Sequence, residues 1–137
     1  MREWKVENLK WVVEGELARY CRPGRYDGGD IWDVSIDRVD DWILHLLEHG
    51  IKSVICLMDD NHLKCYSDLP DGLLAYYEAN GLNVAHVESP NKRRMTNAKK
   101  QAALEAFEAL PKPVLVHCNK GRTRTGRSVT YIKEAIS

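Results

Sequence analysis

Cys118 and Arg124 are the residues whose types and spacing point most directly to chemistry. They lie in the stretch VLVHCNKGRTRTG, which spans Val114–Gly126. The short β-branched run that opens this stretch follows Pro113 and predicts a buried strand. From about Arg124 the spacing of the apolar residues predicts a helix. Cys118 is therefore expected at the mouth of a short polar loop that leads from a strand into a helix N-terminus.

A loop of this kind suits a phosphate group. Its backbone N–H groups point inward and the helix end adds partial positive charge, so that together they bind an oxyanion. The predicted phosphate-binding residues are Asn119, Lys120, Gly121, Arg122, Thr123, Arg124 and Gly126.

Three side chains of the stretch have distinct catalytic roles in this interpretation. The field of the loop favours the thiolate form of Cys118, which makes it the candidate nucleophile. Arg124 can donate hydrogen bonds to two phosphate oxygens at once and stabilise the charge that spreads over them in the transition state. Thr125 can donate a hydrogen bond to the sulfur when it leaves a phosphocysteine intermediate.

His117-Cys118, five further residues and Arg124-Thr125-Gly126 resemble the signature of the cysteine-dependent protein-tyrosine and dual-specificity phosphatases. The resemblance implies phosphate-ester hydrolysis through a phosphocysteine, and we expect no metal or other cofactor. Only Val114–Gly126 matches specifically, although the order of elements agrees over most of the chain. The plain alternative is a buried, inert cysteine at a strand end. The spacing of Cys, Arg, Thr and Gly after an apolar strand favours the functional interpretation.

The general acid of that family has no obvious counterpart here. Relatives usually place an aspartate on a loop before the cysteine, where it protonates the departing oxygen. The matching loop, Glu88–Arg94, carries Asn91 at that place, and Thr123 fills the alternative place before the arginine. The Asp59-Asp60 pair can equally be a turn or a helix cap. The remaining candidates for the acid are Asp60, Asp59 and Glu88.

Basic residues crowd the loops that are expected to flank this site. Lys120 and Arg122 lie in the signature loop, and Lys92–Arg94 lie in the loop before the next predicted helix. A basic residue at the position of Arg122 is similar to branches of the family that act on phosphoinositides or highly phosphorylated inositols. The predicted partners are therefore a phosphorylated protein, on phosphotyrosine or phosphoserine and phosphothreonine, or a small polyanionic phosphate ester.

The same residues are also compatible with three other functions. A phosphoanhydride or an RNA 5′-triphosphate releases a weakly basic leaving group, for which a strong acid matters less. A chain that retains Cys118 and Arg124 without an acid could instead bind phosphate without turnover. A rhodanese-like sulfur carrier shares a cysteine loop in an α/β domain, but Arg-Thr-Gly at this spacing argues against it.

The remaining elements predict an α/β fold for a single domain, residues 1–137. Strands at about 53, 84 and 114 alternate with helices, which predicts a mostly parallel central sheet flanked by helices, with a short C-terminal end. Loops at the carboxyl ends of such strands converge on one site. The expected elements are a hairpin around Glu14-Gly15, a helix capped by Asp33 or Ser35 with Val39, Trp42, Ile43, Leu46 and Leu47 facing inward, a strand at Ser53–Leu57, a helix at Asp71–Ala79, a strand at Val84–Val87 and a helix from Thr96 or Asn97 to about Leu110.

Composition and charge indicate the expected location and partners of the protein. No apolar run approaches the ~20 residues of a membrane span, and the charged N-terminus lacks the apolar segment of a signal peptide. Residues 1–90 carry 9 Lys/Arg against 17 Asp/Glu, whereas residues 91–137 carry 11 against 3. This asymmetry predicts one anion-attracting face. We expect a cytoplasmic monomer with reduced cysteines and no nucleic-acid partner, because no stacking aromatics or RNA-binding module is visible.

Overall fold

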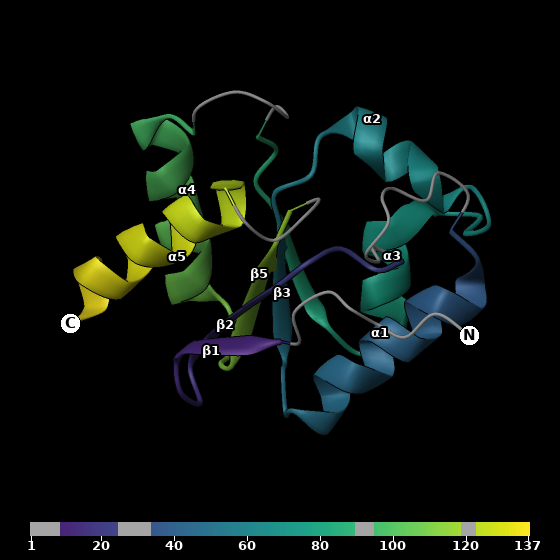
Figure 1. Cartoon of the computed structure of the whole chain (residues 1–137), viewed down its shortest axis with the longest axis horizontal. Helices are drawn as coiled ribbons and strands as arrows, with labels where there is room; N and C mark the ends of the chain where they lie inside the picture. The colour runs from purple at the N-terminus through teal and green to yellow at the C-terminus, as the bar shows by residue number, and fades with distance from the viewer. Residues whose placement is uncertain (1–8, 25–33, 90–94, 119–122) are drawn as a thin grey trace.

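The computed structural model describes residues 9–24, 34–89, 95–118 and 123–137. In these ranges the chain forms a five-stranded sheet with helices on both faces (Figure 1). The elements in chain order are β1 (Lys10–Val13), β2 (Leu17–Tyr20), α1 (Ile36–Glu48), β3 (Ser53–Cys56), α2 (Asp60–Leu63), the 3-10 helix η1 (Lys64–Tyr66), α3 (Gly72–Ala79), β4 (Asn83–His86), α4 (Asn97–Ala109), β5 (Val114–His117) and α5 (Thr123–Ile136).

The sheet has the strand order β1-β2-β5-β3-β4. The last four strands in this order are parallel, and β1 pairs antiparallel with β2 at one edge. Every residue of β3 and β5 is buried, as expected for central strands covered on both faces. The prediction of a mostly parallel sheet is confirmed, and the carboxyl ends of β2, β3, β4 and β5 share one edge.

Two apolar cores fill the space between the sheet and its helices. Figure 1 shows α4 and α5 on one side of the sheet and α1 and α3 on the other. Successive strand residues point to opposite faces. Leu115 accordingly packs in the core that contains Trp42 of α1, whereas Val114 and Val116 pack in the core that contains Phe107 of α4.

Helix α1 confirms most of the predicted apolar face and corrects one residue of it. Val39, Trp42, Ile43 and Leu46 are buried, which is the spacing of one helical stripe. Leu47 was expected to face inward, but its side chain is 46% exposed. One position after Leu46 turns the side chain by about 100°, off the stripe and towards solvent.

The caps of the helices are only partly those expected. Ser35 is the N-cap of α1, but its side chain makes no capping bond. The carboxylate of Asp68 instead accepts from the backbone N–H of Ile36 at 2.8 Å. Thr96 caps α4 as expected, accepting from Lys99 N–H at 3.2 Å.

The N-terminal hairpin and the boundaries of several elements agree with the sequence to within a few residues. Gly15, with φ +78°, allows the tight turn between β1 and β2. Strand β4 begins one residue earlier than predicted and ends before Val87. The sequence offered a helix cap as one interpretation of Asp59-Asp60 but gave no bounds for the short helix α2 or the 3-10 turn after it, because their few residues carry no helical periodicity.

Leu115 and Leu47 offer a matched test of the packing. The side chain of Leu115 is 0% exposed and that of Leu47 is 46% exposed. Leu115→Ala is expected to lower the free energy of unfolding by about 2–5 kcal/mol, because it leaves a cavity between sheet and helix. Leu47→Ala should change it by roughly 0.5 kcal/mol or less. Urea unfolding measures both; equal losses would contradict this placement of the core.

Candidate active site

The candidate catalytic residues meet at the carboxyl edge of the sheet. Cys118 directly follows β5, and Arg124 and Thr125 lie in the first turn of α5. All three side chains are buried, with exposed fractions of 2%, 5% and 0%. The strand and helix that position them are those expected from the sequence.

Part of the predicted site lies outside the described residues. This applies to four of the predicted phosphate-binding residues and to four loop positions that bear on the acid or on the substrate charge, so those predictions stay predictions. They are Asn119, Lys120, Gly121 and Arg122, together with Asn91 and Lys92–Arg94. Thr123 opens α5.

Arg124 is held in place by the backbone of two other strand ends. Its Nη1 donates to the carbonyl of Ser89 at 2.7 Å and to that of Leu57 at 3.4 Å. Leu57 directly follows β3, and Ser89 follows β4 after two intervening residues. The guanidinium is thus oriented by the protein before any anion arrives, which is the preorganisation that charge stabilisation requires. No sequence pattern signals these carbonyl contacts.

Thr125 has a buried hydroxyl that stands out chemically. Its side chain is fully buried, and among the described residues Oγ1 has no hydrogen-bond partner. Leaving a buried hydroxyl unsatisfied costs about 1–3 kcal/mol. A buried polar group without a partner requires an explanation, and the role of sulfur donor predicted for Thr125 provides one.

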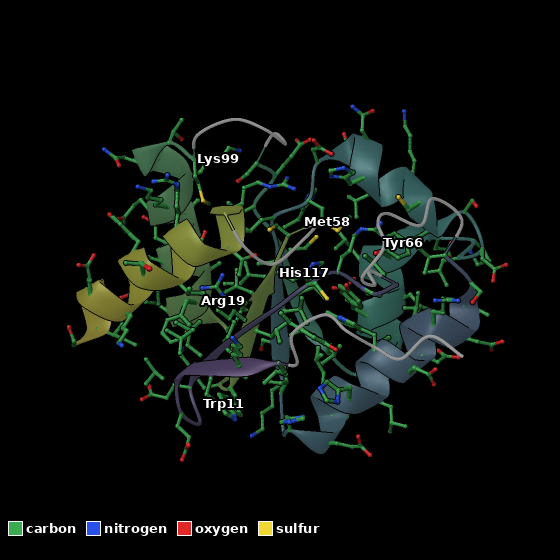
Figure 2. The ribbon with its side chains drawn as sticks, in the orientation of Figure 1. Trp11, Arg19, Met58, Tyr66, Lys99 and His117 are labelled. Carbon is green, nitrogen blue, oxygen red and sulfur yellow. The ribbon has the colours of Figure 1, made fainter. Side chains whose placement is uncertain are left out.

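His117 was not assigned a role from the sequence, yet its ring contacts the backbone of Cys118. Its Nδ1 lies 3.2 Å from the carbonyl oxygen of Cys118, and its Nε2 lies 2.9 Å from the hydroxyl oxygen of Tyr77. A carbonyl only accepts, so Nδ1 carries the proton and Nε2 accepts from Tyr77. The indole ring of Trp42 packs edge-on against the imidazole at 5.2 Å. Figure 2 shows His117 near the middle of the molecule.

Burial keeps the His117 ring neutral. Its pKa falls to about 3, chiefly because the ring is desolvated, with the charges of Arg22 and Arg124 acting in the same direction. The hydrogen bond to the Cys118 carbonyl opposes this shift without overcoming it. His117 therefore orients the backbone of Cys118 as a neutral donor.

Arg22 is a fully buried arginine whose charge helps to lower the pKa of His117. Arg22 is 0% exposed although it belongs to a stretch whose composition predicts a loop. Its Nη1 donates to the hydroxyl oxygen of Tyr66 at 3.3 Å, and that hydroxyl donates to the carbonyl of Pro23 at 2.7 Å. Burial raises the pKa of Tyr66.

The three candidate acids lie together on the loops after β3 and β4. Asp59 is the N-cap of α2 and accepts from His62 N–H at 3.0 Å, so the helix-cap interpretation is confirmed for it. The backbone N–H of Asp60 donates to the carboxylate of Glu88 at 3.3 Å. Asp60 and Glu88 are both exposed. Asp59 therefore serves as the N-cap of α2. Asp60 and Glu88 lie beside one another and are exposed to solvent.

Cys56 is a buried thiol that differs from Cys118 in its surroundings. All four cysteines are free thiols. Burial raises the pKa of Cys56 to about 12, and the negative charge of a Cys118 thiolate adds to this rise while Arg124 opposes it. Cys56 is therefore an inert core thiol. Cys118 differs in adjoining a helix N-terminus and Arg124.

The described residues contain no group of three or more His, Cys, Asp and Glu side chains that could hold a metal ion. The rings of His45 and His49 lie side by side, with centroids 4.5 Å apart. The Nδ1 of His49 is 2.8 Å from the His45 carbonyl, a contact within the helix end. None of the helices in the described ranges has the length and apolarity to cross a membrane.

Comparison with known proteins gives structures but no sequence matches. Neither the models of protein families nor the curated proteins match this chain. Among solved structures, Tk-PTP has a TM-score of 0.61 and 19% identity, covering 93% of this chain and 72% of its own. The core catalytic domain of SIW14, a PP-IP phosphatase from S. cerevisiae, has a TM-score of 0.63 and 21% identity, covering 94% and 66%. Kinase associated phosphatase, solved with its catalytic cysteine replaced by serine, has a TM-score of 0.67 and 16% identity, covering 98% and 79%.

The chain has the fold of the protein-tyrosine and dual-specificity phosphatases. In this phosphatase fold the described residues bring Cys118, Arg124 and Thr125 to one strand–helix junction, as the sequence predicted. At these identities the likeness establishes the architecture, and the chemistry rests on the residues of this chain.

The neutral state of His117 predicts how stability depends on pH. Between its folded pKa of about 3 and the ordinary value of 6.5, the unfolded chain binds a proton that the folded chain excludes. Stability is therefore lost as the pH falls below about 6.5, by up to ~1.4 kcal/mol per pH unit. Urea unfolding at pH 7, 6 and 5 should show a steeper loss for the unaltered protein than for His117→Gln.

The ring itself provides an independent readout. In an NMR titration from pH 7 to pH 5, the ring protons of His117 should keep their chemical shifts, because the imidazole stays neutral over this range. A midpoint near pH 6.5 would contradict the placement of His117. This measurement remains decisive if the glutamine variant does not fold.

Proposed function

We propose that this protein is a cysteine-dependent phosphatase that hydrolyses phosphate monoesters through a phosphocysteine intermediate. The observation that carries the proposal is the arrangement of Cys118 and Arg124. A buried cysteine directly follows the central strand, and the guanidinium of Arg124 in the first turn of the next helix is fixed by the carbonyls of Ser89 and Leu57. A thiolate and an oriented cation at the two ends of one short loop suit in-line phosphoryl transfer.

In the first step, the Cys118 thiolate attacks the phosphorus and the bond to the departing oxygen breaks. Arg124 and the backbone of the loop stabilise the charge on the equatorial oxygens. The departing oxygen takes a proton from a general acid. We assign this role to Asp60 or Glu88, because both are exposed at the site edge whereas Asp59 caps α2.

In the second step, water attacks the phosphorus of the phosphocysteine and gives a proton to the carboxylate that acted as the general acid, which restores that acid. The S–P bond breaks, inorganic phosphate leaves and the thiolate is regenerated. The buried Thr125 hydroxyl, which has no partner within the described residues, supports a role as donor to the departing sulfur. Such a bond strengthens as negative charge develops on sulfur, so it lowers the barrier to hydrolysis.

Release of phosphate from an aryl phosphate tests this proposal. Cys118→Ser should lower the rate by at least about a thousandfold, because the nucleophile is lost. Arg124→Lys should lower it by roughly 10²–10³, because a point charge replaces a planar fork. Wild-type folding of both variants, checked by circular dichroism, is the control. A Cys118→Ser protein as active as the unaltered one would contradict the proposal.

The pH profile of the same reaction addresses the acid. A bell-shaped profile from pH 5 to 8, whose basic limb disappears in Asp60→Asn or in Glu88→Gln, would identify the donor. The matched variant Asp59→Asn should retain the limb. A rising acidic limb with no falling basic limb would favour substrates with weakly basic leaving groups. Because SIW14 is a PP-IP phosphatase, phosphoanhydrides belong among the substrates tested.

A second candidate function is phosphate binding without turnover. It is favoured by the cap that occupies Asp59 and by Asn91 at the place of the family acid. In that case phosphorylated ligands bind, release stays at background and Asn91→Asp creates activity. Rapid release by the unaltered protein, with no gain in Asn91→Asp, would exclude it.

A further inference from the structure

A hollow of about 610 Å³ lies on the outer face of α5 and is not used by the proposed chemistry. The lining residues that matter here are Arg19, Lys100, Gly126, Arg127, Tyr131 and Glu134. They come from β2, from α4 and from three successive turns of α5. Figure 2 shows Arg19 beside α5 and far from the helices of the opposite layer.

The charged residues that line this hollow are mainly basic. Arg19, Lys100 and Arg127 are set against one acidic residue, Glu134. Arg127 is exposed, and Lys100 is half-buried. Three cations around a concave surface attract an anionic ligand more strongly than the same cations spread over a flat one.

Two contacts give the hollow a fixed shape. A Cβ atom at Gly126 would stand 3.3 Å from Nη2 of Arg19, so the glycine is what lets the guanidinium lie against the first turn of α5. On the other side, the hydroxyl of Tyr131 donates to Oε1 of Gln101 at 2.8 Å. This bond joins α5 to α4 at the residue next to Lys100.

The dimensions of the hollow suit a short peptide better than a single anion. From Gly126 to Glu134 the helix rises about 12 Å, at ~1.5 Å per residue. An extended peptide covers that length with roughly four residues. A phosphate would meet the basic end alone, and Glu134 would repel the outlying phosphates of a small polyphosphate. Glu134 can instead pair with a basic side chain of a peptide.

The hollow adjoins the candidate active site through α5 itself. Arg124 and Thr125 are buried in the first turn of α5, whereas Gly126 and Arg127, which follow directly, line the hollow. The hollow and the candidate active site therefore share the first turn of α5.

We propose that this hollow is a docking site for an acidic segment of a phosphorylated protein substrate. Acidic side chains of the segment contact Arg19, Lys100 and Arg127, and a basic residue of the segment faces Glu134. The phosphorylated residue of the same protein occupies the loop between Cys118 and Arg124. This inference rests on the proposed function and narrows its substrate class to phosphoproteins with acidic residues near the modified site.

Peptide kinetics test the docking site. The substrates are phosphotyrosine peptides with four glutamates before or after the phosphotyrosine, the same peptides with glutamine instead, and an aryl phosphate. Arg127→Glu and Lys100→Glu should each lower kcat/KM for at least one acidic peptide by about tenfold at 0.15 M salt. Both should leave the glutamine peptides and the aryl phosphate within roughly twofold of the unaltered protein.

Lys133→Glu is the matched control, because Lys133 is exposed on α5 and lies outside the hollow. It makes the same change in net charge and should affect all substrates alike. The proposal is overturned if Lys133→Glu lowers kcat/KM for the acidic peptides as much as Arg127→Glu does. It is also overturned if Arg127→Glu weakens inorganic triphosphate as an inhibitor and leaves the peptides unaffected.

A binding measurement separates this proposal from the proposed function. Fluorescence anisotropy can follow the acidic phosphopeptide on the Cys118→Ser protein, where no turnover is needed. If the unaltered protein releases no phosphate but Arg127→Glu still weakens this binding about tenfold relative to Lys133→Glu, the docking site stands and the catalytic proposal fails. Equal binding by the two charge variants overturns the docking site whatever the activity.

Discussion

The contact on which the rest of the candidate site depends is the attachment of Arg124 to the backbone carbonyls of Leu57 and Ser89. These carbonyls are themselves set by the sheet. The N–H of Leu57 donates to the carbonyl of His117, and the N–H of Ser89 donates to the carbonyl of Leu57. The register of three neighbouring strands therefore fixes the guanidinium relative to the end of β5. A change that shifts one strand end moves the cation away from the thiol.

The burial of His117 and Tyr77 imposes a second constraint on the candidate site. His117 and Tyr77 form a fully buried polar pair, and the fields of Arg22 and Arg124 reach the imidazole. A protonated His117 would add a third cation to this desolvated region, and its low pKa shows that the fold excludes that proton. Positive charge is thus supplied by arginines, which stay charged at every working pH. Histidine contributes shape and a donor to the Cys118 backbone.

The sequence predicts the parts of this molecule that follow from local patterns. The strand before Cys118, the helix after Arg124 and the parallel sheet all come from periodicity and from a spacing that few other structures need. What it missed depends on contacts between distant segments. The partner of His117 lies on α3. The carboxylate that accepts from the first N–H of α1 belongs to Asp68 and not to the N-cap residue Ser35. Arg22 is buried although the composition around it predicts a loop. Leu47 was misplaced because a stripe and its edge differ by one residue.

The central claim is that Cys118 carries the phosphoryl group during turnover. The most direct test is to mix the protein with a ³²P-labelled phosphorylated substrate, quench in acid within the first turnovers and locate the label by mass spectrometry of the peptides. The account predicts a thiophosphate on Cys118, none in Cys118→Ser, and a longer-lived one in Thr125→Ala, because sulfur then leaves without a donor. Turnover with no label on Cys118, or with the label on another residue, would contradict it.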